Sequence, residues 1–399
     1  MSPSTDRTTK KVWTLDQLGA LDLGVAEEDL AIRDTTRKAL ADLARPHVAQ
    51  WYLDGALPVR DLAKELGSLG LLGMHLDGYG CAGTSATAYG LVCAEVEAVD
   101  SGLRSLVSVQ GSLAMFSIHA YGSEEQKQEW LPRMATGEAI GCFGLTEPDQ
   151  GSDPGNMRTR ARRDGDDWVL DGTKMWITNG SVASVAVVWA QTEDGIRGFV
   201  VPTDTKGFSA PEIKGKLSLR ASVTSELVLE GVRLPDSAML PGAKGLSGPL
   251  GALSEARYGI VFGAMGAARD ALTTAIDYAG SREQFGRPIA GFQLTQAKLV
   301  DLGTDYITGM LLALQLGRLK DAGQITPQQV SLGKLNNVRR ALAIARECRS
   351  VLGANGISSE YAPLRHAANL ESVLTYEGTT EMHTLVLGQA LTGHAAFRG

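Results

Sequence analysis

The residue types that most readily build metal, redox or nucleophilic sites are sparse in this chain. Its four cysteines form no CxxC pair, and no histidine lies at metal-ligand spacing from any of them: Cys81, Cys93, Cys142 and Cys348. Isolated cysteines of this kind are usually buried or half-buried thiols of a protein kept in a reducing compartment. We therefore expect free thiols and no metal centre.

The common cofactor and nucleophile motifs are absent as well. No GxGxxG follows a predicted strand, and the chain contains no GxSxG, HExxH or P-loop sequence. A Rossmann dinucleotide site is therefore not expected. Any cofactor must be held by a different arrangement of residues.

Composition narrows the class of protein further. A length of 399 residues suggests two or three packed units rather than one core. A net charge of -7 leaves no basic footprint for nucleic acid, and no apolar run is long enough to span a bilayer. Residues 1–11 are polar and lack the apolar stretch of a secretory signal, so we expect a cytoplasmic protein with no nucleic-acid or membrane partner.

The elements that must position any site fall into three stretches. Residues 27–137 show helical spacing of apolar side chains, interrupted by a Gly-rich loop at 77–83. Residues 142–242 are β-rich: short strands are predicted at 168–170, 175–177, 185–189 and 199–201, separated by turns that contain Gly, Asp or Asn. Residues 253–279, 295–319 and 327–352 predict long helices, with Pro327 at a helix start and Gly353 at a stop.

This order predicts an α+β multidomain fold. We expect a helical N-terminal domain at 1–138, a small β-barrel or sandwich domain at 139–242, and a helical C-terminal domain of four-helix type at 243–399. No internal repeat of solenoid period is evident.

Five short segments, in this order, resemble those of the acyl-CoA dehydrogenase family. They are CFGLTEP at 142–148 with GSD at 151–153, KMWITNG at 174–180, REQFG at 282–286 with Gln293, GANG at 353–356, and YEGT at 376–379. The resemblance covers about residues 15–395. It implies the three-domain fold of that family, FAD as cofactor, an acyl-CoA substrate and an electron-transfer flavoprotein as electron acceptor.

The resemblance also assigns the cofactor residues. It places these side chains around the isoalloxazine ring: Phe143, Leu145, Thr146, Ser152, Trp176 and Thr178. It places a second group on the pyrophosphate and adenine, from a neighbouring subunit, which implies a homotetramer: Arg282, Phe285 and Gln293. Further cofactor contacts are implied at Leu352, Gly353, Gly356, Thr379 and Glu381.

Glu377 is the catalytic residue that the resemblance implies. A desolvated carboxylate can remove the weakly acidic proton beside a thioester carbonyl, because burial raises its pKa toward neutrality. The carbonyl oxygen is polarised in the family by a flavin hydroxyl and the backbone N–H of this glutamate. Some relatives carry the base near the position of Ala256, which has no carboxylate here, although Glu255 is adjacent.

The segment at 97–110 resembles that of the glutaryl-CoA dehydrogenases within the family. There it presents an arginine to the distal carboxylate of the acyl chain, which corresponds to Arg104 here. Such an arginine would be costly in a pocket for neutral chains. The substrate residues implied are Glu97, Arg104, Ser105, Ser108, Ser152, Arg257, Tyr376 and Gly378.

The expected reaction is therefore the conversion of glutaryl-CoA, or a similar acyl-CoA, to crotonyl-CoA and CO2. Three alternatives stay open. One is a relative that stops at glutaconyl-CoA without decarboxylation, and another is a dehydrogenase for short neutral acyl chains. The third is a catalytically silent flavoprotein or interaction protein on the same scaffold.

Overall fold

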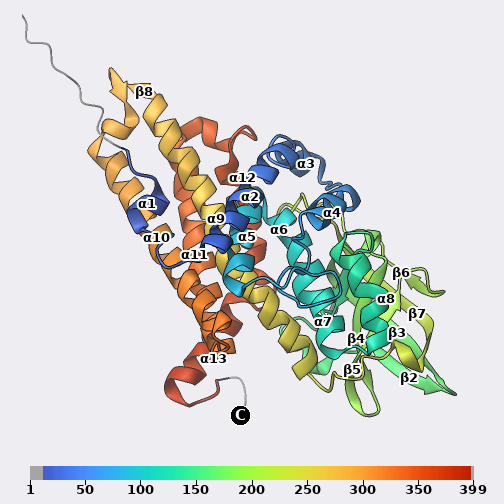
Figure 1. The fold of residues 1–399 in the computed structure, drawn as a ribbon. Helices are drawn as coiled ribbons and strands as arrows, with labels where there is room; N and C mark the ends of the chain where they lie inside the picture. Colours follow the sequence, from blue (N-terminus) through green and yellow to red (C-terminus); the bar gives the residue numbers. More distant parts are fainter. Residues whose placement is uncertain (1–11, 397–399) are drawn as a thin grey trace, which may run out of the picture.

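The computed structural model describes residues 12–396, and the expectation about a leader at residues 1–11 lies outside them. The first stretch is helical, as the sequence predicted, and a π-helical segment η1 (Val109–Met115) joins α6 to α7. Its helices are α1 (Leu15–Gly19), α2 (Glu27–Leu43), α3 (Val48–Asp54), α4 (Val59–Ser68), α5 (Ala86–Glu97), α6 (Ser101–Ser108), α7 (Phe116–Tyr121) and α8 (Glu124–Ala135). α5 packs on α9 of the C-terminal helices, α6 to α8 lie toward the sheet, and α1 lies beside α10, away from the sheet (Figure 1).

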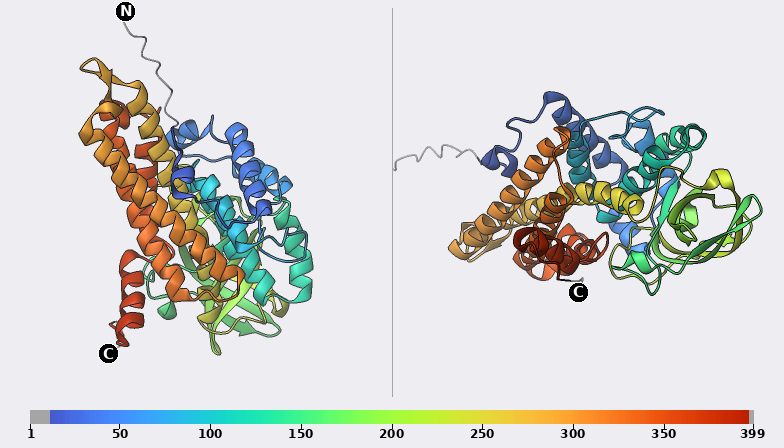
Figure 2. Two further views of the ribbon diagram at one scale, coloured as in Figure 1. Left: turned by 60° about the vertical axis from the view of Figure 1, so that its left-hand side comes forward. Right: turned by 90° about the horizontal axis from the view of Figure 1, so that it is seen from below.

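The middle stretch forms one curled sheet rather than two packed sheets (Figure 2). The strand order is β1-β4-β2-β3-β7-β6, and β5 pairs with β4. The strands are β1 (Gly141–Gly144), β2 (Arg160–Asp164), β3 (Asp167–Thr178), β4 (Val185–Thr192), β5 (Gly195–Pro202), β6 (Phe208–Ser209) and β7 (Thr224–Pro235). Of the barrel and the sandwich, the single curled sheet matches the barrel.

One sequence prediction in this stretch is wrong. Residues 168–170 and 175–177 were expected to form two strands separated by a turn, but both belong to the continuous strand β3. The register of β3 against β7 shifts between Leu170 and Gly172, and again between Lys174 and Ile177. Such β-bulges bend a strand without ending it, which is why the Asp-Gly pair at 171–172 does not make a turn.

The last stretch contains α9 (Ser247–Ser281), α10 (Gln293–Asp321), α11 (Pro327–Val351), α12 (Ala362–Thr375) and α13 (Thr380–Thr392). The three predicted long helices are confirmed. α11 begins with a capping box formed by Thr326 and Gln329 around Pro327, and it ends just before Gly353, which has a φ of 59°. A short hairpin of β8 (Glu283–Gln284) and β9 (Arg287–Pro288) connects α9 to α10.

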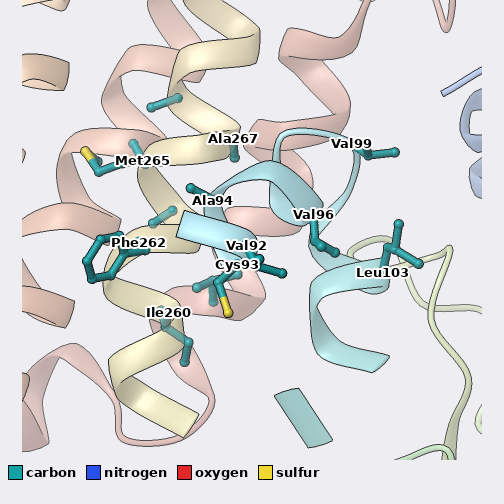
Figure 3. Packing of buried hydrophobic residues seen from close by; sticks show 14 of the residues in the cluster. Val92, Cys93, Ala94, Val96, Val99, Leu103, Ile260, Phe262, Met265 and Ala267 are labelled. Carbon is teal, nitrogen blue, oxygen red and sulfur yellow. The ribbon is translucent and has the colours of Figure 1, made fainter. Parts of the chain in front are cut away.

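The largest hydrophobic core lies where α5 packs on α9 (Figure 3). Val92 and Val96 of α5 and Ile260 and Phe262 of α9 are all buried. α11 and α12 pack on α9 from other sides. These contacts fix the relative positions of Glu97, at the end of α5, and of side chains from α9 and α11 that meet it.

Among residues 12–396, no helix has both the length and the hydropathy that crossing a membrane requires. The four cysteines are free thiols, and all except the half-buried Cys81 are buried.

Candidate functional site

The loop between α12 and α13 carries the expected catalytic residue in an unusual backbone conformation. Glu377 has a φ of 52° and Gly378 a φ of 99°. A non-glycine residue in the left-handed region typically costs about 1–3 kcal/mol and persists only where its surroundings hold it. Here cations from two helices bind the carbonyl oxygens of the loop. Arg257 Nε donates to the oxygen of Glu377 at 2.7 Å, and Lys334 Nζ donates to those of Tyr376 and Gly378 at 2.5 and 2.6 Å.

The carboxyl group of Glu377 points into the protein. The residue is half-buried overall, but its Oε2 atom is enclosed and has no hydrogen-bond partner. Burial raises the pKa of Glu377, an effect that the positive charges of Arg104 and Lys334 oppose. An enclosed carboxylate with a raised pKa and a vacant acceptor atom can take a proton from a weak carbon acid held against it.

Arg104, on α6, lies beside this loop and is completely buried together with Glu97. Its Nε donates to Glu97 Oε2 at 2.7 Å, and its Nη2 donates to the hydroxyl of Tyr376. Ser101 donates to the other oxygen of Glu97 at 2.8 Å. The carboxylate of Glu97 therefore holds the guanidinium in one plane and orientation.

Three polar atoms of this cluster are buried without any partner: Arg104 Nη1, Ser105 Oγ and Ser108 Oγ. Residues 104, 105 and 108 share one face of α6 because of their helical spacing. Leaving a buried donor unsatisfied costs about 1–3 kcal/mol, and more for a charged group. Vacant donors gathered in one place fit an anionic oxygen ligand.

A glycine of α9 makes the room that this ion pair occupies. A Cβ at Gly263 would lie 2.1 Å from Glu97 Oε2 and 3.4 Å from Arg104 Nε. Any larger residue would displace the pair, so the sequence of α9 and the charge cluster of α5 and α6 are matched.

The buried charges around Glu377 do not balance. Arg104, Arg257 and Lys334 are cationic when ionised, and Glu97 and Glu377 are anionic, so the cluster carries one excess positive charge. A substrate with one carboxylate at the end of its acyl chain would neutralise it.

The second part of the site is the bulge of β3 on the curled sheet. Lys174, inside the sheet, donates to the oxygen of Leu145 at 3.1 Å and to Glu147 Oε1 at 2.9 Å. Met175 N donates to the oxygen of Thr146 at 2.8 Å. These bonds attach the bulge to the loop that follows β1.

Trp176 stands on the outer side of that bulge. It is 59% exposed and has a φ of 62°, so a large aromatic side chain is held at the surface by a strained backbone. Thr146 and Thr178 are half-buried, and Ser152 is exposed. An exposed aromatic face with hydroxyl groups nearby fits a flat ring with polar edges, such as the flavin expected from the sequence. The side chains of Phe143 and Leu145 are buried in the hydrophobic cluster that includes Trp189.

The remaining expected cofactor residues lie elsewhere. Arg282, Phe285 and Gln293 are exposed, at the hairpin end of α9 and α10 (Figure 1), and Phe285 is 96% exposed. The 25 residues between Arg257 and Arg282 follow α9, which separates these two positions by roughly 37 Å. Within one chain the hairpin group and Glu377 therefore do not come together.

The segment after α11 lies at this same distant end. Asn355 Nδ2 donates to the hydroxyl of Tyr278 at 3.0 Å, and Tyr278 O accepts from Arg282 N at 2.8 Å. Leu352 and Gly356 are buried there, while Gly353 is exposed. Thr379 and Glu381 instead lie beside Glu377: Thr379 caps α13 by accepting from Met382 N at 3.3 Å, and Glu381 is exposed.

Glu255, the alternative base, is engaged elsewhere. It pairs with Lys320 of α10 at 2.7 Å.

Sequence analysis missed two buried residues of the loop environment, Lys334 and His383. Lys334 is 2% exposed and lies on the apolar face of α11 between Val330 and Val338, four residues from each. A lysine on an apolar stripe was the signal that could have found it. Burial lowers the pKa of His383 to about 3, so it is neutral beside the two cations that bind the loop.

Comparisons with known proteins identify the family of the chain. Family models match residues 26–138 (acyl-CoA dehydrogenase, N-terminal domain), 142–232 (acyl-CoA dehydrogenase, middle domain) and 243–392 (acyl-CoA dehydrogenase, C-terminal domain). The mitochondrial short-chain specific acyl-CoA dehydrogenase of Homo sapiens is 37% identical over 363 residues, which are 89% of this chain and 87% of that protein.

Two solved structures are more similar. The crystal structure of glutaryl-CoA dehydrogenase from Mycobacterium smegmatis has a TM-score of 0.96 and 69% identity, and the match covers 97% of this chain and 100% of that one. A glutaryl-CoA dehydrogenase from Mycobacterium smegmatis in complex with FADH2 has a TM-score of 0.96 and 64% identity, with the same coverage of both chains.

Proposed function

This chain belongs to the acyl-CoA dehydrogenase family, and on that premise we propose that it oxidises and decarboxylates glutaryl-CoA to crotonyl-CoA and CO2. FAD is its cofactor, and the electrons pass to an electron-transfer flavoprotein. The observation that carries the choice of substrate is the set of vacant donors around Arg104, beside the loop of Glu377.

The substrate is held at both ends of its acyl chain. The thioester end lies at the loop of Glu377, and the distal carboxylate meets Arg104 Nη1 with Ser105 and Ser108 as hydroxyl partners. Arg104 suits this role because Glu97 and Tyr376 already fix two of its nitrogens and leave the third for the ligand. A neutral acyl chain would leave all three donors unsatisfied.

Glu377 takes the α-proton of the bound thioester. FAD supplies the acceptor for the β-hydride when bound. Arg257 binds the carbonyl oxygen of Glu377 and Lys334 that of Tyr376. In this proposal the backbone N–H of Glu377 stabilises negative charge on the thioester oxygen. After dehydrogenation the γ-carboxylate leaves as CO2. Its bonding electrons pass into the conjugated thioester, which is then protonated to give crotonyl-CoA.

The cofactor residues at the distant end of the bundle support an assembly of several copies. In one chain Arg282, Phe285 and Gln293 are too far from Glu377 to reach the same cofactor molecule. We propose that they serve the FAD of a neighbouring copy in a homotetramer, and that the assembly is cytoplasmic. We also propose that the domains of each copy meet at residues 138/139 and 242/243.

A short-chain dehydrogenase for neutral substrates is the second candidate, favoured by the 37% identity to the human short-chain enzyme. The buried ion pair of Arg104 and Glu97 argues against it, because such a pair has no use in a pocket for butyryl chains. A non-decarboxylating relative that releases glutaconyl-CoA would use the same arginine and glutamate pair and would differ only in the final step.

The test uses the purified holoenzyme and its Glu377→Gln variant under anaerobic conditions. Wild type should be bleached by glutaryl-CoA at a rate far above that with butyryl-CoA. The variant should retain FAD and bind the substrate but lose bleaching by a factor on the order of a hundred or more, because an amide is a very poor base. Normal bleaching of the variant would overturn the assignment of the base.

A further inference from the structure

Three consecutive carbonyl oxygens, those of Tyr376, Glu377 and Gly378, are each bound by a buried or half-buried cation. Arg257 binds the middle one from α9, and Lys334 binds the two outer ones from α11. Lys334 is 2% exposed, and within residues 12–396 both of its hydrogen bonds go to this loop. A lysine buried at such cost needs a role that an apolar residue could not perform.

We propose that Lys334 is a positioning residue for Glu377: by binding the carbonyl oxygens on both sides of it, the ammonium group fixes the left-handed backbone that aims the carboxylate, and its charge keeps that carboxylate ionised. The inference rests on the proposed function, in which Glu377 is the base.

The geometry explains why one ammonium group serves both purposes. Binding the oxygens of residues 376 and 378 closes the loop around residue 377, which cannot then relax to an ordinary conformation without breaking a charge-assisted hydrogen bond. The aromatic ring of Tyr376 lies 5.8 Å from Lys334 Nζ, so the ammonium group is packed as well as bonded.

The charges that face Lys334 come from every helix packed around it. Glu377 attracts the ammonium group, while Arg257 of α9 and Arg104 of α6 repel it. His383 of α13 is neutral, and the carboxylate of Glu97 is held by Arg104. Burial and these repulsions lower the pKa of Lys334 to about 7, with Glu377 acting in the opposite direction. The protonation of Glu377 and that of Lys334 are therefore coupled. Loss of the ammonium charge must raise the pKa of Glu377.

The experiment compares three holoenzymes with wild type: Lys334→Met, Lys334→Arg and Lys320→Met. Lys320 is the control, because it is a half-buried lysine of the same helical bundle whose partner is the side chain of Glu255 and not the loop at 376–378. Two quantities are followed against pH. One is the rate of flavin reduction at saturating acyl-CoA, and the other is the protonation of Glu377 itself, taken from infrared difference spectra of each protein against its Glu377→Gln counterpart.

Lys334→Met should raise the pKa of Glu377 by about one unit or more, since the positive charge of Lys334 lowers that pKa and a nearby opposite charge shifts a carboxyl pKa by about this amount. The acid limb of flavin reduction should move up by the same amount. The rate near neutral pH should fall by roughly tenfold to a hundredfold, with less change in KM. Lys320→Met should match wild type in both measurements.

A uniform loss of rate at all pH values, with the titration of Glu377 unmoved, would show that Lys334 only supports the fold and would overturn the proposal. Should Lys334→Met fail to fold, Lys334→Arg decides. It keeps the charge while displacing the donors, so the titration should stay near that of wild type while the rate falls, and a titration displaced by a unit would contradict the proposal. Unimpaired flavin reduction in Glu377→Gln alone would instead refute the base assignment, which separates the two failures.

Discussion

Substituting both Glu97 and Arg104, which form a buried ion pair, distinguishes an effect on substrate specificity from an effect on folding stability. Arg104→Gln alone would leave the carboxylate of Glu97 buried without a cation, a change that costs about 3–5 kcal/mol of folding free energy in comparable pairs. The double variant Glu97→Gln/Arg104→Gln leaves two neutral amides in place of the ion pair, so neither position keeps a buried charge without its partner. It should therefore fold and retain FAD.

The double variant should nevertheless lose its preference for a dicarboxylic substrate. The distal carboxylate of glutaryl-CoA would enter a buried place without its cation, and removing one partner of such a pair costs about 2–5 kcal/mol. The value of kcat/KM for glutaryl-CoA should then fall by roughly 30-fold to several thousand-fold. With butyryl-CoA the change should stay within about tenfold, which is about 1.4 kcal/mol, because its acyl chain carries no distal carboxylate that loses a cation.

The assay is anaerobic flavin reduction by both substrates, with FAD content and thermal unfolding measured on the same preparations. Arg104→Gln alone should show the same loss of specificity together with a lower melting temperature. Equal losses on glutaryl-CoA and butyryl-CoA in a well-folded double variant would refute the reasoning, because the pair would then support the active site without reading the substrate.

Three further predictions follow from single contacts. Gly263→Ala should lower kcat/KM for glutaryl-CoA selectively, since the new methyl group would displace Glu97. Gly280→Ala on the same helix, where a Cβ would have nothing within 4 Å, should leave the kinetics unchanged and stabilise α9 by about 0.5–1 kcal/mol. Equal kinetics for the two variants would contradict this prediction. Burial opposes ionisation of Glu95, but two arginines of α2 and α9 lower its pKa to about 2. The ionised carboxylate of Glu95 therefore stabilises the fold above the unfolded pKa near 4.5, and this stabilisation is lost as pH falls toward 2. In urea unfolding, Glu95→Gln should have a free energy of unfolding about 3 kcal/mol below that of wild type at pH 7, and the difference should narrow below about pH 5. A difference that does not change with pH would contradict this prediction. Trp176→Ala should raise the Kd for FAD by roughly three- to tenfold with little change in stability, as titration of the apoprotein would measure; an unchanged Kd would exclude a ring contact.

The helices were predictable from the sequence because their signals are local. Apolar spacing, with Pro327 at the start and Gly353 as the stop, located α11 to within a residue at each end. The bulges of β3 were not predictable, since the Asp-Gly pair at 171–172 has the local chemistry of a turn. Only pairing with β7, distant in sequence, keeps the strand continuous.

The candidate site, like the fold, was predictable from the sequence only where the signal is local. Glu377 and Arg104 were found through short segments that resemble a known family, and the structure places them side by side, joined through Tyr376. The matching of Gly263 to Glu97 and the two bonds of Lys334 to the loop depend on helix packing between residues far apart in the chain. No local pattern records such contacts, although a lysine on an apolar helix face marks a place to look.

The most direct test of the proposed function is the fate of glutaryl-CoA in a single turnover. Holoenzyme is mixed anaerobically with one equivalent of glutaryl-CoA labelled at the distal carboxyl carbon, and flavin bleaching, labelled CO2 and the acyl-CoA product are measured together. The account predicts bleaching with release of labelled CO2 and formation of crotonyl-CoA. Bleaching with glutaconyl-CoA as the end product would contradict the decarboxylation, and no bleaching by glutaryl-CoA alongside rapid bleaching by butyryl-CoA would contradict the role of Arg104.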